Sequence, residues 1–157
     1  MRNAYGMPNT GASAALDPML CFAVYSLDRR IGRIYRDLLA PVNLSYTQYI
    51  VLRALWGNDG MPLTVSELGE VLDLDSGTLS PLLARLESRG LIRRARGGGG
   101  DERIVRVALT DDGAELEAKV GDVQQLLCER IPADPADVAD LLGRLRAVSD
   151  AIATARG

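Results

Sequence analysis

Two cysteines and a set of tyrosines carry the most distinctive chemistry in this chain of 157 residues. Cys21 follows Asp17-Pro18, a pair that is typical of a helix start, within roughly the first turn. A helix attracts negative charge at its amino terminus, which favours the nucleophilic thiolate form of a cysteine placed there. Cys21 is therefore a candidate redox-active thiol.

Two tyrosines recur at helical spacings from Cys21, and a third lies on the next expected helix. Tyr25 lies four residues on and Tyr35 fourteen, close to four full turns, so both return to the face of the cysteine. Tyr46 belongs to the next expected helix and could fold back toward them. A phenol can donate a hydrogen bond to a thiolate, stabilising the anion that attacks a peroxide. Cysteines and tyrosines at such spacings are also ordinary core residues, so both interpretations stay open here.

Composition excludes several other classes of function. The chain has no histidine, which removes the commonest zinc ligand and the usual general base, so we predict no metal, no cofactor and no enzyme activity. No apolar stretch approaches the roughly eighteen residues of a membrane span, and residues 1–15 lack the apolar core of a signal peptide. With only two cysteines, the chain is expected in the reducing cytoplasm.

Residues 64–113 predict a winged helix-turn-helix: a short helix, a tight turn, a second helix and a two-stranded hairpin with a glycine and arginine tip. Thr64 or Ser66 opens the first helix, Asp75 or Ser76 caps the second, and Gly90 ends it. The wing strands are expected at 91–94 and 104–109. The side chains expected to face inward are Val65, Leu68, Val71 and Leu72 of the first helix, and Leu79, Leu82, Leu83 and Leu86 of the second.

The second of these helices carries small hydroxyls and an arginine suited to phosphates and base edges. In the wing, Arg103 could enter the minor groove while Asp101 holds its guanidinium. Each hydroxyl alone could be a helix cap, but as a set they predict DNA contact. The predicted DNA-binding residues are Ser76, Thr78, Ser80, Pro81, Arg85, Asp101 and Arg103.

Charge is divided along the chain, although the net charge is only −3. Residues 85–106 hold seven arginines (85, 89, 93, 94, 96, 103 and 106) against three acids, whereas 111–140 holds nine acids and two bases. Screening limits each charge to about 8 Å at physiological salt, so a local basic patch can still bind phosphate.

Flanking helices complete a mainly α fold with a small β wing. Ser45 caps a helix to about Trp56, and Thr110 starts one that continues to about Arg130. Apolar residues at spacings of three and four predict a long first helix from Leu20 to Leu38 and a last one from Val138 to Val148. The terminal helices have no other obvious partner, which predicts a helical dimer interface. We expect a loose arm at 1–15 and one domain at 16–157, with the winged head at about 45–110 and dimerisation helices at about 16–44 and 111–157.

The segment DERIVRVALTDDG, residues 101–113, resembles the wing signature of the MarR family of transcriptional regulators. LCFAVY at 20–25, with tyrosines fourteen and twenty-five residues after the cysteine, resembles the organic hydroperoxide resistance regulators of that family. The resemblance implies a homodimer on pseudo-palindromic DNA, with Cys21 as the peroxide sensor and Tyr25, Tyr35 and Tyr46 around it. Tyr49 has no such match and is expected in the core.

Cys128 lies where the two-cysteine branch of these regulators has a cysteine that resolves the oxidised sensor, typically as a disulfide to the other subunit. A small cellular thiol that caps Cys21 is the alternative. We predict a repressor that leaves DNA when Cys21 is oxidised. Two other functions stay open: release by a non-covalent phenol or aromatic acid, and a thiol peroxidase, against which the chain has neither a histidine nor an α/β pattern.

Overall fold

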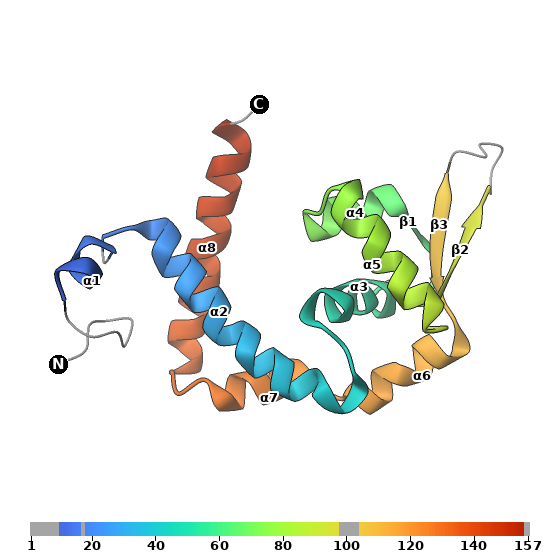
Figure 1. The fold of residues 1–157 in the computed structure, drawn as a ribbon, viewed down its shortest axis with the longest axis horizontal. Helices are drawn as coiled ribbons and strands as arrows, with labels where there is room; N and C mark the ends of the chain where they lie inside the picture. The colour runs from blue at the N-terminus through green and yellow to red at the C-terminus, as the bar shows by residue number, and fades with distance from the viewer. Residues whose placement is uncertain (1–9, 17, 98–103, 156–157) are drawn as a thin grey trace. The chain divides into compact units, whose positions relative to one another are not determined.

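The computed structural model describes residues 10–16, 18–97 and 104–155, and the chain divides into two compact units, 1–123 and 124–157 (Figure 1). The predicted fold class, mainly helical with a small antiparallel sheet, is confirmed. Within the described ranges, no helix combines the length and apolar character of a membrane span.

Helix α2 spans Leu20–Leu39, close to the predicted long first helix. Its N-cap is Met19, which makes no side-chain capping hydrogen bond, so the helix begins two residues later than the predicted cap at Asp17, a residue that lies outside the described ranges. Pro41 lies in the single turn η1 (Ala40–Val42), and the helix direction is lost at Asn43, which adopts a left-handed conformation with φ of 51°. A short helix α1 (Gly11–Leu16), which no periodicity indicated, precedes α2.

The helices of the winged head begin at the predicted caps. Ser45 and Gln48 form a reciprocal capping box at the start of α3 (Tyr46–Trp56), and Thr64 and Glu67 do the same for α4 (Val65–Leu72). The carboxylate of Asp75 accepts from the Thr78 amide at 2.8 Å and starts α5 (Ser76–Ser88). Each cap satisfies amides that would otherwise lack partners, which is why these positions define the helix starts.

Burial in α5 follows the sequence pattern, whereas burial in α4 departs from it once. The four leucines expected on the inner face of α5 are all buried: Leu79, Leu82, Leu83 and Leu86. In α4, Leu68 is fully buried, but Val71 is 67% exposed, so its inward assignment is wrong. Helix α4 packs through a narrow stripe centred on Leu68 and Leu72, and Val71 lies about a quarter turn away from that stripe.

The wing is part of a three-stranded antiparallel sheet in the order β1-β3-β2, rather than the predicted pair of strands (Figure 1). Strands β2 (Ile92–Arg96) and β3 (Val105–Leu109) pair along their length, and the two-residue β1 (Leu63–Thr64) adds to the other edge of β3. A strand of two residues is too short to show a period of two, so the sequence could not reveal it.

A buried junction joins α3, the base of the wing and helix α6 (Asp111–Val120). Thr110 caps α6 and also donates its hydroxyl to the Gly90 carbonyl at 2.5 Å. The Trp56 indole donates to the Gly113 carbonyl at 2.9 Å in a buried hydrogen bond. A Cβ at Gly113 would overlap the backbone of Leu91, so only glycine lets α6 approach this closely.

The long helix predicted from Thr110 to Arg130 is in fact two helices. Helix α6 ends at Gly121, whose φ of 62° breaks the helical path, and α7 (Val123–Arg130) follows. The last helix, α8 (Pro135–Ala155), is present as predicted. Its stripe of apolar side chains is exposed, as the dimer prediction requires: Leu141, Leu142, Leu145, Val148 and Ile152.

Candidate functional site

Cys21 is the second residue of α2, at the amino-terminal end of that helix, and it is exposed. Tyr25, one turn on, is 55% exposed, and the Arg29 guanidinium lies over its ring at 5.7 Å from the centroid. In the single chain the thiol is therefore open to solvent.

Tyr35 and Tyr46 are brought together from α2 and α3, with ring centroids 4.5 Å apart. Tyr49 is buried, as expected for a core residue, and joins them at 5.9 Å from Tyr35 and 6.4 Å from Trp56. Burial, helped by the charge of Asp28, raises the pKa of Tyr46. Burial is also the largest cause that raises the pKa of Tyr49. Both phenols therefore keep their protons and remain hydrogen-bond donors.

The expected cluster of Cys21 with Tyr35 does not form within one chain. The two residues share a face of α2, but fourteen residues of helix separate them by about 21 Å along its axis. Helical spacing predicts a common face correctly and says nothing about distance along it. Cys128, the second cysteine, is exposed on α7.

Helix α5 presents its predicted DNA-binding side to solvent. Exposed positions on it are Ser76, Thr78, Ser80, Pro81 and Arg85. Thr78 also serves the cap, since its hydroxyl lies 3.3 Å from the Asp75 carboxylate. Asp101 and Arg103, the predicted wing contacts, fall outside the described residues.

Two arginines of the predicted basic patch are engaged within the protein. Arg94 of β2 donates from its guanidinium to Glu87 of α5 at 2.6 and 2.8 Å, and the Arg94 amide donates to the same carboxylate at 2.9 Å. Arg89 donates to the carbonyls of Val42 and Asn43. The basic patch available to phosphate is therefore smaller than the number of arginines suggests. Neither set of hydrogen bonds could be predicted from spacing in the sequence.

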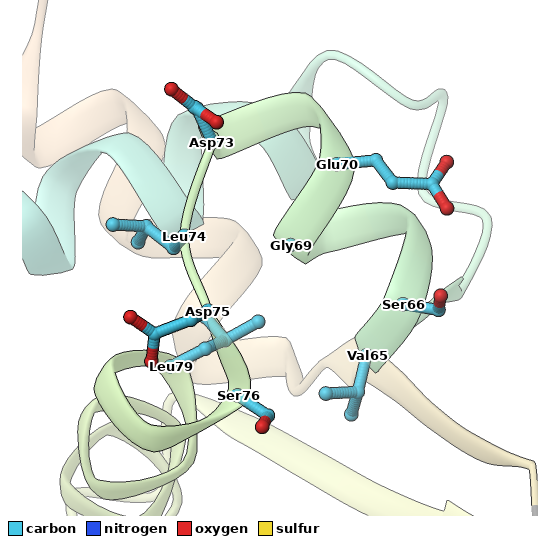
Figure 2. Close-up of a pocket in the computed structure, with 9 residues that line it drawn as sticks. All are labelled: Val65, Ser66, Gly69, Glu70, Asp73, Leu74, Asp75, Ser76 and Leu79. Atoms are coloured by element: carbon cyan, nitrogen blue, oxygen red, sulfur yellow. The ribbon is translucent and has the colours of Figure 1, made fainter. Parts of the chain in front are cut away.

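A pocket of about 690 Å³ lies at the turn between α4 and α5, and Figure 2 shows the residues that line it, Gly69 among them. A Cβ at Gly69 would come within 2.9 Å of the Leu74 carbonyl, so glycine permits this tight turn. Glu70, Asp73 and Asp75 are among the residues that line the pocket. Negative charge on these three residues disfavours phosphate binding in the pocket.

Sequence comparison adds the family. The family model for the transcriptional regulators SarA/Rot matches residues 33–120. Over 117 residues the chain is 44% identical to the organic hydroperoxide resistance transcriptional regulator of Bacillus subtilis (strain 168), covering 74% of this chain and 78% of that protein. The chain belongs to the MarR-like SarA/Rot family of transcriptional regulators. Its resemblance to the hydroperoxide regulators, first visible in residues 20–25, is thereby confirmed.

Other relatives agree with this assignment. The MarR-like chain is 53% identical over 106 residues to the HTH-type transcriptional regulator TtmR of Methylorubrum extorquens (strain PA1), covering 68% of this chain but only 53% of TtmR. Reduced AbfR bound to DNA superposes with a TM-score of 0.76 at 27% identity, covering 94% of this chain and 99% of that one. The disulfide-formed AbfR superposes with a TM-score of 0.61 at 31% identity, covering 87% of this chain and 94% of that one.

Acid should weaken the winged head of this MarR-like regulator. Hydrogen bonds from Arg94 lower the pKa of Glu87, and backbone amides lower those of Asp75 and Glu67. These hydrogen bonds stabilise the folded state only while the carboxylates are ionised. Their contribution is therefore full at neutral pH and is lost as the pH falls below the ordinary carboxyl range. We expect urea midpoints to drop in that window, and the drop to be smaller in Glu87→Gln. Parallel pH curves for the two proteins would contradict this.

Proposed function

We propose that this protein is a DNA-binding transcriptional repressor that senses organic hydroperoxides through Cys21. The observation that carries the proposal is an accessible cysteine at the start of α2 in the same compact unit as an exposed DNA-reading helix. The relative from Bacillus subtilis, named for organic hydroperoxide resistance, supports the signal, and the DNA-bound form of AbfR supports the partner.

The proposed chemistry is a two-electron oxidation of Cys21. The thiolate sulfur attacks one oxygen of the hydroperoxide, the O–O bond breaks, and the leaving alkoxide takes up a proton to become an alcohol. The sulfur becomes a sulfenic acid. A second thiol then condenses with it, forming an S–S bond and releasing water. We assign that thiol to Cys128 of the other subunit, a pairing that requires Cα atoms within about 7 Å. The disulfide form of AbfR supports this route.

A homodimer gives the tyrosines their role. Since Tyr35 lies about 21 Å along α2 from Cys21 in the same chain, the Tyr35–Tyr46 pair can reach a Cys21 thiolate only across a subunit interface. Tyr25, one turn from Cys21, borders the same thiol from its own chain. Two subunits also present two α5 helices to successive major grooves about 34 Å apart. The proposed site is therefore shared between subunits, and the protein acts in the cytoplasm, where its DNA lies.

The sensor reacts once per thiol and is no enzyme, so hydroperoxide should be consumed in proportion to protein rather than continuously.

A second candidate, release by a phenol or aromatic acid, is favoured by a pocket of about 490 Å³ between α5 and the wing, lined by Ser80, Leu83 and Val105 among others. We would measure fluorescence anisotropy on DNA from upstream of the protein's own coding region. Release of the DNA on addition of one equivalent of cumene hydroperoxide supports the redox repressor. Release of the DNA by salicylate and not by hydroperoxide supports the second candidate, and continued consumption of peroxide supports an enzyme.

A further inference from the structure

Arg89 makes a long-range contact between the end of α5 and the corner that joins α2 to α3. It is the C-cap residue of α5, and its guanidinium donates to the Asn43 carbonyl at 2.7 Å and to the Val42 carbonyl at 3.2 Å. The two partners lie 46 and 47 residues away in the sequence. The contact joins two segments that the chain itself connects only through α3, β1 and α4.

The chemistry of the corner explains why a guanidinium binds there. Carbonyls at the end of a helix lack intrahelical donors and carry partial negative charge. Val42 ends η1 and Asn43 is its left-handed C-cap, so their carbonyls form such an end directly after α2. An arginine presents several donors in one rigid plane and can bind two successive carbonyls at once, whereas a lysine offers a single point charge.

We propose that Arg89 is a positioning residue that couples α2, which carries the sensor cysteine, to the DNA-reading helix α5. This proposal rests on the function proposed above. Helix α5 has 13 residues and is about 20 Å long, with its DNA-binding hydroxyls near one end and Arg89 at the other. The Glu87–Arg94 contact joins the same end of α5 to strand β2 of the wing. Arg89 holds the α2–α3 corner to α5, so a displacement of α2 on oxidation also moves α5 and the wing.

The other role open to Arg89 is a direct phosphate contact, and it has a different signature. Loss of a phosphate contact weakens reduced and oxidised protein alike and lowers the salt dependence of binding by about one ion. Loss of a coupling contact changes the ratio of the two affinities instead. The oxidised-to-reduced Kd ratio therefore separates coupling from simple binding.

The test compares full-length wild type, Arg89→Gln and Arg89→Lys by anisotropy on the same DNA, before and after one equivalent of cumene hydroperoxide. Mass spectrometry verifies equal oxidation of Cys21. Arg53→Gln, which removes an exposed arginine paired with Glu117 at 3.4 Å, is the matched control. Thermal melts verify folding, and Arg89→Lys, which keeps the charge, serves if Arg89→Gln does not fold.

We expect oxidation to weaken wild type and Arg53→Gln about a hundredfold, Arg89→Gln only about fivefold, and Arg89→Lys by an intermediate factor. An Arg89 variant that releases DNA as wild type does, or that loses DNA in both redox states, overturns the coupling role. Wild type that keeps its DNA when oxidised overturns the proposed function itself, so the two failures are distinguishable.

Discussion

Serine at position 21 should keep the protein on its DNA after hydroperoxide treatment, while wild type is released. A serine hydroxyl has nearly the size of the thiol but provides no thiolate at neutral pH, so the O–O bond is not attacked. If oxidation favours the released state by about 3 kcal/mol, wild type weakens more than a hundredfold and Cys21→Ser not at all. Anisotropy on DNA from upstream of the protein's own gene, with one equivalent of cumene hydroperoxide, measures both.

Cys128→Ser is the matched control, because it removes the other exposed cysteine. We expect it to form the Cys21 sulfenic acid but no protein disulfide, so that non-reducing gels separate the two roles. If Cys21→Ser is released as readily as wild type, the sensor is misassigned even though the fold stands. A disulfide-linked dimer that persists in Cys128→Ser would overturn the resolving role of that residue.

Gly113→Ala should strongly destabilise the junction between α6 and the base of the wing. The added methyl would overlap the carbonyl oxygen of Leu91 and also meet a Leu109 methyl group at 3.4 Å. The Leu91 backbone cannot change rotamer as a side chain can, so α6 must shift. This shift strains the Trp56 hydrogen bond to the Gly113 carbonyl. We expect a loss of about 3 kcal/mol, at the upper end for overpacking.

Urea unfolding at fixed protein concentration measures that loss as a midpoint lowered by about 1 to 2 M. Gly32→Ala is the control, since it lies in α2 with open space around its Cα and should gain stability by about 0.5 to 1 kcal/mol. A Gly113→Ala protein as stable as wild type would mean that α6 does not pack against Leu91 as described.

Much of the fold was predictable because the signals are local. A cap such as Ser45 or Asp75 acts on amides two or three residues away, and the leucines of α5 repeat with the period of the helix itself. The resemblance in residues 101–113 also has a local explanation. Thr110 caps α6 while Gly113 permits its close approach, so both residue types are required by the junction they form.

What the sequence could not predict depends on contacts between distant segments. Arg89 and Arg94 look like free cations until the fold brings Asn43 and Glu87 beside them. The separation of Cys21 from Tyr35 is invisible to an argument based only on helical faces. Likewise, α6 and α7 share a plausible helical pattern, and only the positive φ of Gly121 divides them. Periodicity describes one element at a time, whereas the site depends on how several elements meet.

The junction at Trp56 also gives the protein a built-in optical probe. Trp56 is the only tryptophan in the chain, and it is 9% exposed. Its indole packs edge-on against Tyr49 and donates to Gly113, so its emission senses the base of the wing and the aromatic row that begins at Tyr35. A rearrangement at the base of the wing should therefore change the intrinsic fluorescence of the unlabelled protein, with no need for DNA.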